Sequence, residues 1–159
     1  MILMKKPFDT FTFPSGATAR NRFVLAPMTT YASNDDLTLS DEEDVYYNSR
    51  SKDIGIVITA ATAISKNAQA FPNQISISDE RYLDSMKRLA TTIKKEGALA
   101  VIQLHHGGRM NVPGLVVNQD IVSASSIKAN REYAAVPREL KTSEIYDVID
   151  DFCNATKLA

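Results

Sequence analysis

Cysteine and tryptophan are nearly missing from this sequence, and charge of neither sign is in excess. Its 159 residues include one cysteine, no tryptophan, and 18 lysines and arginines against 19 aspartates and glutamates. The single cysteine, Cys153, excludes an internal disulfide framework and fits a reducing compartment. Because the basic residues are scattered along the chain, they offer no dense cationic face, and we expect no nucleic-acid partner.

Long hydrophobic runs and glycine-rich phosphate loops are also missing. The longest apolar stretches, such as residues 54–61, have the length of a strand, and residues 1–8 hold no apolar core of signal-peptide length. We therefore expect a cytoplasmic protein with no membrane partner. No Gly-x-Gly-x-x-Gly follows an expected strand and no Gly-Lys-Ser/Thr occurs, which argues against the usual dinucleotide and nucleoside-triphosphate sites.

What the sequence does contain is an alternation of apolar runs and amphipathic segments. Residues 22–26, 53–59 and 98–104 are expected strands, and the last two have the continuous apolar character of strands buried on both faces. Expected helices are residues 41–52, with a solvated acidic start, a segment capped by Ser78 and ended by Gly97, and a segment capped by Thr142. This order predicts one domain with a parallel sheet built from βαβ units.

Three further features complete the expected organisation. Residues 8–13 and the following Pro14-Ser15-Gly16 predict a small strand and a turn. Residues 107–141 form too long a connection to be an ordinary loop, so they are expected to be functional or to contain small elements. The last helix is expected to pack through one face, which carries Ile145, Val148, Ile149, Phe152 and Thr156, with Cys153 on its apolar stripe.

In a parallel α/β sheet, ligands meet the C-terminal ends of the strands. Three segments qualify here, namely residues 26–31, 59–63 and 103–109. Small residues in the second segment let a planar ligand approach the backbone, and the amide of Gln103 offers both a donor and an acceptor to a heteroaromatic edge. His105 and His106 are adjacent, so their side chains point to opposite strand faces, and we expect no metal site.

Two of these segments carry a family resemblance. Residues 21–29, Asn-Arg-Phe-Val-Leu-Ala-Pro-Met-Thr, resemble the first strand of the Old Yellow Enzyme family, and residues 103–109 match its Gln-Leu-x-His-x-Gly-Arg pattern. Residues 136–140 match the usual Pro-Arg-Glu approach to the next helix, so the resemblance covers essentially the whole chain. It implies the N-terminal part, about three β/α units, of a (β/α)₈ TIM barrel, with residues 1–159 belonging to a single FMN-binding domain.

The resemblance also implies roles for individual residues. The backbone of Ala26, Pro27 and Met28 would line FMN, Thr29 would bond near a flavin carbonyl, Ala61 would back the flavin edge, and Gln103 would bind the pyrimidine end. Tyr31 matches a tyrosine that reaches the substrate pocket. Two simpler roles stay open, because Thr29 could be a turn residue and Tyr31 an ordinary wall of its loop. His106 is expected to pack or hydrogen-bond beside the site.

The activity that the resemblance implies is reduction of FMN by NAD(P)H, followed by hydride transfer to an activated alkene such as an enone. The family's oxyanion-binding pair, proton donor and phosphate site would lie after the third helix, outside this sequence. The alternative is therefore a truncated, catalytically incompetent fragment or interaction module. Two protein partners also stay open, a second copy of the chain and the missing C-terminal part of the barrel.

Overall fold

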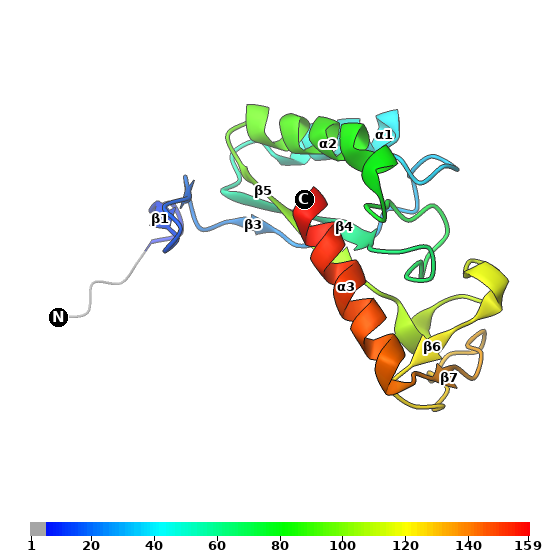
Figure 1. Cartoon of the computed structure of the whole chain (residues 1–159). Coiled ribbons are helices and arrows are strands. Elements are labelled where there is room, and N and C mark those ends of the chain that lie inside the picture. Colours follow the sequence, from blue (N-terminus) through cyan, green and yellow to red (C-terminus); the bar gives the residue numbers. More distant parts are fainter. Residues whose placement is uncertain (1–5) are drawn as a thin grey trace.

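The core of the molecule is a three-stranded parallel sheet. The computed structural model describes residues 6–159, and its sheet consists of β3 (Val24–Leu25), β4 (Ile56–Ala63) and β5 (Leu99–His105) in that order. The connections run through α1 (Asp41–Arg50) and α2 (Leu83–Lys95), which lie side by side against one face of the sheet (Figure 1). A third helix, α3 (Thr142–Leu158), follows β5 and contacts it. The predicted parallel order of strands is confirmed.

Smaller elements surround this sheet. A hairpin of β1 (Phe11–Thr12) and β2 (Thr18–Ala19) precedes β3, as the turn signal predicted. The long connection after β5 contains the 3₁₀ turns η2 (Gly108–Met110) and η3 (Val117–Gln119) and the parallel pair β6 (Val122–Ser123) and β7 (Arg138–Glu139). Another 3₁₀ turn, η1 (Glu80–Tyr82), leads into α2. No helix within residues 6–159 has the length and apolarity to cross a membrane.

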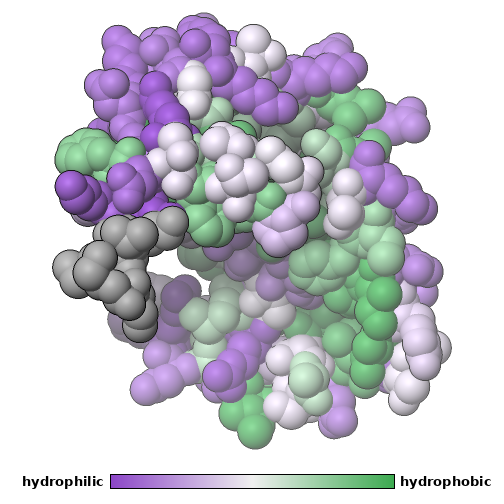
Figure 2. Space-filling view, turned by 90° about the vertical axis from the view of Figure 1, so that its left-hand side faces the viewer, coloured by the Kyte–Doolittle hydropathy of each residue, from purple (hydrophilic) through white to green (hydrophobic). Residues whose placement is uncertain are grey.

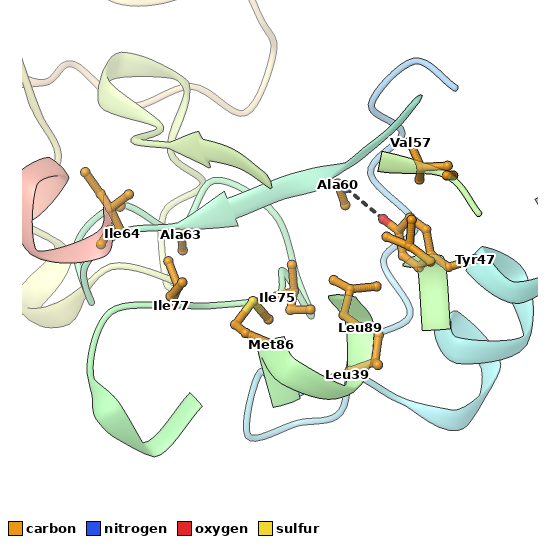
Figure 3. Packing of buried hydrophobic residues seen from close by; sticks show 14 residues of the cluster. Leu39, Tyr47, Val57, Ala60, Ala63, Ile64, Ile75, Ile77, Met86 and Leu89 are labelled. Atoms are coloured by element: carbon orange, nitrogen blue, oxygen red, sulfur yellow. Dashed lines mark hydrogen bonds between the residues drawn. The ribbon is translucent and has the colours of Figure 1, made fainter. Parts of the chain in front are cut away.

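The hydrophobic core fills the space between the sheet and the helices. Val57 of β4, Leu89 and Ile93 of α2 and Tyr47 of α1 are all nearly inaccessible to solvent (Figure 3). The buried Tyr47 hydroxyl oxygen accepts a hydrogen bond of 2.7 Å from the backbone N–H of Ala60, at the irregular part of β4. Burial raises the pKa of Tyr47 to about 12, so the phenol stays neutral. The Ala60 N–H, which lies in the irregular part of β4, thus has a hydrogen-bond partner inside the core.

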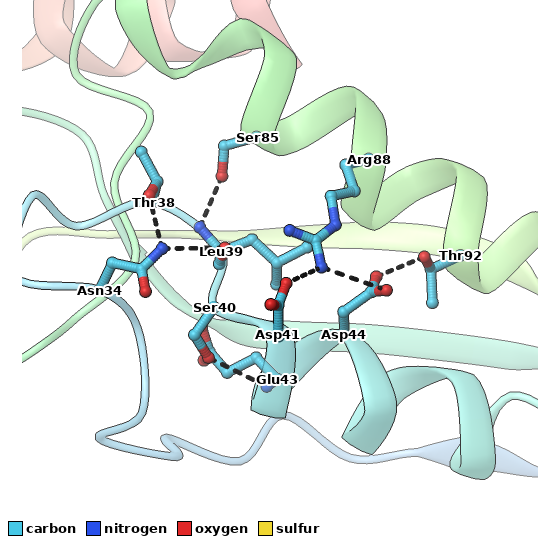
Figure 4. A network of polar contacts seen from close by, with 10 residues as sticks. All are labelled: Asn34, Thr38, Leu39, Ser40, Asp41, Glu43, Asp44, Ser85, Arg88 and Thr92. Atoms are coloured by element: carbon cyan, nitrogen blue, oxygen red, sulfur yellow. Dashed lines mark hydrogen bonds and ion pairs between the residues drawn. The ribbon is translucent and has the colours of Figure 1, made fainter.

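Helices α1 and α2 are also joined by a polar network at their edge (Figure 4). Arg88 of α2 lies 2.6 Å from Asp41 and 3.4 Å from Asp44 of α1, and the Thr92 hydroxyl donates to Asp44. Leu39 donates its backbone N–H to the Ser85 hydroxyl at 2.7 Å. The prediction that the acidic start of α1 is solvated holds for the exposed Asp41 and Glu42 but is wrong for Asp44, which α2 partly covers, and for Glu43, which is buried.

One face of the sheet is partly open at β3 and β5, which corrects the prediction of burial on both faces for residues 98–104, whereas in β4 the consecutive residues 59–63 are all buried, as predicted. Val24 of β3 is 48% exposed and Val101 of β5 is 41% exposed. Ala100 and Ile102 flank Val101 in β5, point to the other face of the sheet and pack against the core. The strands were correctly located, but within residues 6–159 the second face is only partly covered at β3 and β5. Figure 2 shows apolar side chains reaching the surface among polar ones on one side of the molecule.

The packing of α3 also differs from the sequence prediction. Its buried residue is Ala155, and Leu158 packs beside it, whereas Ile145, Ile149 and Phe152 are 45%, 48% and 37% exposed. Cys153 is exposed rather than packed. The small side chain of Ala155 permits a close approach to the core, so the helix is rotated relative to the face that hydrophobicity alone selected.

Two predicted helix caps are displaced by one residue. Asp79, rather than Ser78, accepts the backbone N–H of Arg81 ahead of α2. At α3 the N-cap is Lys141 rather than Thr142, and the Glu144 carboxylate accepts the Lys141 N–H at 2.6 Å. In both cases a carboxylate satisfies the free N–H groups at the helix start, where negative charge is favoured.

The start of β4 contacts the segment before β3 so closely that only glycine fits. A Cβ on Gly55 would lie 2.2 Å from the carbonyl oxygen of Asn21. Asn21 is itself fixed, because its side chain donates to the Asp53 carbonyl at 2.7 Å and accepts from Phe23 N–H at 3.1 Å.

We expect Gly55→Ala to lower the free energy of unfolding by about 1–3 kcal/mol, since the backbone of one segment must move. Urea denaturation measures this change. Lys52→Ala, at an exposed position close by, is the control and should stay within about 0.5 kcal/mol. Equal stability of the two variants would contradict the close approach.

Candidate functional site

The C-terminal ends of the three strands lie at one edge of the sheet. Leu25 pairs with Val57, and after a register shift in β4 Ala61 pairs with Gln103. Residues 26–29 follow β3 directly, so they leave the sheet at the same end as Ala61 and Gln103. The segments that sequence reasoning selected thus share one end of the sheet.

Gln103 is on the sheet face that points away from α1 and α2. Side chains alternate between the two faces along β5. Ile102 and Leu104 pack against the core, so Gln103 lies on the other face together with Val101 and His105. Its backbone N–H donates to the Thr59 hydroxyl at 3.2 Å, across the irregular part of β4. Among residues 6–159 no hydrogen bond is made by the half-buried Gln103 amide, so its donors and acceptor are free for a ligand.

The residues after β3 are more open. Ala26, Pro27 and Met28 are exposed, and Thr29 is half-buried. Met28 and Thr29 line a hollow of about 420 Å³ together with Glu42, Glu43 and Tyr46 of α1. The walls of this hollow include neither Ala61 nor Gln103. Convergence of Thr29, Ala61 and Gln103 on a single concave surface therefore stays a prediction, although all three lie at one end of the sheet.

An aromatic row stands at the same strand ends. The rings of Tyr31 and Phe71 meet edge to face with centroids 5.6 Å apart, and the Phe71 ring lies 6.0 Å from that of His105. Tyr31 comes from the β3–α1 loop, Phe71 from the β4–α2 loop and His105 from β5. Sequence reasoning placed Tyr31 and His105 at the strand ends but missed Phe71, because nothing in the sequence brings Phe71 to this end of the sheet.

Gln74 determines how His105 is held. The Gln74 side chain is 1% exposed, and its oxygen accepts the backbone N–H groups of Ala70 at 2.8 Å and Phe71 at 3.2 Å. Its amide nitrogen therefore faces His105 Nδ1, at 3.3 Å, and donates to it. Since Nδ1 accepts, the neutral ring carries its proton on Nε2. Burial lowers the pKa of His105, in agreement with a neutral ring.

His106 follows the last residue of β5 directly. Its Nδ1 accepts the backbone N–H of Gly108 at 3.1 Å, at the start of the η2 turn. Burial lowers the pKa of His106, an effect that Asp151 of α3 partly offsets and His105 reinforces. Arg109, next in the turn, is exposed.

We expect the free energy of unfolding to fall as the pH falls from about 7 to about 5.5. Both histidine pKa values are lower in the folded chain than the ordinary histidine value of 6.5, so the unfolded chain takes up protons first and acid favours it. Their contribution is complete above about pH 6.5 and is lost as the pH falls through the folded pKa values. Urea denaturation across this range measures the slope. The double variant His105→Gln/His106→Gln should show a flatter slope, and an unchanged slope would contradict the assignment.

Comparison with known sequences gives consistent relatives. A profile of the NADH:flavin oxidoreductase / NADH oxidase family matches residues 7–159. The chain is 42% identical over 155 residues to a probable NADH-dependent flavin oxidoreductase, YqiG, of Bacillus subtilis. The aligned region is 98% of this chain and 41% of that protein. It is 36% identical to the NADH:fumarate oxidoreductase of Klebsiella pneumoniae over 94% of this chain and 16% of the relative.

Solved structures share the same fold. The Old Yellow Enzyme homologue of Zymomonas mobilis superimposes with a TM-score of 0.87 at 25% identity, over 98% of this chain and 45% of that one. Morphinone reductase in complex with tetrahydroNAD superimposes with a TM-score of 0.89 at 23% identity, over 98% and 46% of the two chains. The chain thus spans less than half the length of these relatives. It belongs to the NADH:flavin oxidoreductase / NADH oxidase family, the family of Old Yellow Enzyme, and carries the N-terminal part of the family's barrel.

Proposed function

We propose that this chain supplies the flavin-ring side of an FMN-dependent NAD(P)H oxidoreductase that reduces activated alkenes. One observation carries the proposal: Gln103, whose side chain makes no hydrogen bond within residues 6–159, pairs in register with Ala61 at the C-terminal end of adjacent parallel strands. The family's substrate chemistry is supported by relatives whose names specify fumarate and acrylate, both alkenes conjugated to a carboxyl group.

The residues present fit the ring of FMN. A flavin pyrimidine edge carries donors and acceptors in alternation, which the Gln103 amide can meet with its own donor and acceptor. Ala61, which is 5% exposed, has no side chain beyond Cβ, so a flat ring on that face would lie close to the backbone of β4. The exposed backbone of Ala26, Pro27 and Met28 would line the ring from β3, with the Thr29 hydroxyl near a ring carbonyl.

Bound FMN would supply the redox chemistry, taking a hydride from NAD(P)H and passing one to the β-carbon of the alkene. The part of this chain is to bind and orient. Gln103 and Thr29 would fix the ring in its plane, and hydrogen bonds to the ring would tune its potential. Tyr31, which is 54% exposed beside Phe71, would form one wall for the alkene. The Nε2–H of His105 would offer a donor on the Gln103 face of the sheet.

A second function class, a catalytically incompetent fragment, is favoured for the chain on its own by a specific observation. Val24 and Val101 are exposed on the sheet face that carries Gln103, and a (β/α)₈ barrel of about 250 residues closes that face with five further strands. An open face lets water compete for every polar group that would hold the ring.

We expect the isolated 159-residue chain neither to retain FMN through desalting nor to reduce 2-cyclohexenone with NAD(P)H. Loss of one oxyanion donor alone costs acyl-transfer enzymes about 10²-fold or more in rate, and here the family's pair and its phosphate site lie in the remaining part of the barrel. A chimera that continues this chain with the rest of the Bacillus subtilis relative should do both. Absorbance near the flavin maxima and NAD(P)H oxidation measure the two properties. Stoichiometric flavin and turnover in the short chain would refute the fragment prediction, and a folded chimera without flavin would refute the FMN proposal.

We further expect Gln103→Leu in that chimera to weaken FMN binding by about tenfold or more, because the ring loses polar partners worth roughly 1–3 kcal/mol. Fluorescence titration with FMN measures the dissociation constant. The same substitution at Gln119, an exposed glutamine in η3, is the matched control. Equal affinities in the two variants would show that Gln103 does not contact the ring.

A further inference from the structure

A buried carboxylate joins α1 to the loop that follows β3. Glu43, in the first turn of α1, is 1% exposed. One of its carboxylate oxygens accepts the hydroxyl of Ser33 at 2.6 Å, and the other accepts the hydroxyl of Thr30. Ser40 caps the helix by accepting the Glu43 backbone N–H at 3.1 Å (Figure 4). Both hydroxyl donors to the carboxylate come from the β3–α1 loop.

The environment of Glu43 contains no cation. Among residues 6–159 its carboxylate makes no ion pair, so two hydroxyls and the N-terminal end of the α1 dipole stabilise its charge. Removing a carboxylate from water is costly unless hydrogen bonds replace the lost hydration. The charge therefore binds both hydroxyls firmly, and charge-assisted bonds of this kind are among the strongest that a loop can make.

The two hydroxyls flank a strained turn. Tyr31, between Thr30 and Ser33, has a φ of 58°, a conformation that costs a non-glycine residue about 1–3 kcal/mol and persists only when its surroundings enforce it. From the other side, Asn73 of the β4–α2 loop donates its amide to the Ser33 carbonyl at 2.9 Å. The turn is thus fixed at both ends, and Glu43 supplies two of the bonds that fix it.

We propose that Glu43 is a positioning residue that holds the Thr29–Tyr31 turn in the conformation in which Thr29 and Tyr31 face the ligand at the strand ends. Glu43 would touch neither cofactor nor substrate, because it is 1% exposed and both of its carboxylate oxygens already accept hydrogen bonds from Thr30 and Ser33. The ligand-binding roles of Thr29 and Tyr31 rest on the proposed function above. The conformational claim does not, and it can be tested on the chain without flavin.

Hydrogen–deuterium exchange of the 159-residue chain tests this claim. Glu43→Ala should raise exchange in residues 28–34 about tenfold or more, while residues 41–50 of α1 stay within about twofold. Glu43→Gln should restore most of the protection, since its amide can pair with both hydroxyls. Glu42→Gln removes the same charge from the exposed neighbouring position and should match the parent chain.

Two outcomes would overturn the proposal: unchanged exchange in residues 28–34, or a rise of equal size in α1 and in the loop, which would mean that Glu43 only supports the helix. If Glu43→Ala does not fold, Ser33→Ala and Thr30→Val each remove one hydroxyl donor and should raise exchange in the same segment.

In the flavin-loaded chimera, Glu43→Ala should raise the KM for 2-cyclohexenone about tenfold with flavin still stoichiometric. Failure of the parent chimera to bind FMN would refute the proposed function alone, because the exchange result is obtained without flavin.

Discussion

Parallel hydrogen bonding between β4 and β5 positions every group that this chain could offer to a ligand. The ladder places Ala61 opposite Gln103 and Ala63 opposite His105, and the pairing of β3 with the start of β4 brings residues 26–29 to the same edge. In parallel strands the C-terminal ends lie at one edge, so residues far apart in the sequence are placed at the same end of the sheet. The register shift in β4 between Ile58 and Ala61 is part of this arrangement. The Tyr47 hydroxyl accepts the backbone N–H of Ala60 in β4, and the Thr59 hydroxyl accepts the backbone N–H of Gln103 in β5.

Apolar packing fixes the sheet, but buried polar side chains fix the loops at its ligand-binding end. Tyr47, Glu43 and Gln74 are each almost fully buried, and each bonds to a backbone or hydroxyl group of a neighbouring segment. Gln74 orders the β4–α2 loop and sets the tautomer of His105, while Glu43 orders the β3–α1 loop. Hydrophobic contact is non-directional and could not hold either loop in one conformation. A buried polar group can do so, because an unmade bond costs it the full loss of hydration.

The same sheet is unfinished as a barrel wall. Its helical face is covered, whereas Val24 and Val101 are exposed on the face that carries Gln103. The chain spans 41% of the Bacillus subtilis relative and 45% and 46% of the two solved structures. A parallel sheet normally needs cover on both faces. Within residues 6–159 the pairing of Ala61 with Gln103 is thus complete, whereas Val24 and Val101 are left without full cover.

The sequence by itself determined the order of strands and helices, the parallel sheet and the selection of residues 26–29, Ala61 and Gln103, because apolar periodicity and strand-end position are local properties of the chain. Its motifs also led to the family that the comparisons show. It did not reveal the rotation of α3, the exposure of Cys153, the contact of Arg88 with Asp41 and Asp44, or the roles of Glu43 and Gln74. Only the tertiary structure decided these, since whether a polar side chain is solvated or buried depends on which distant segment packs against it.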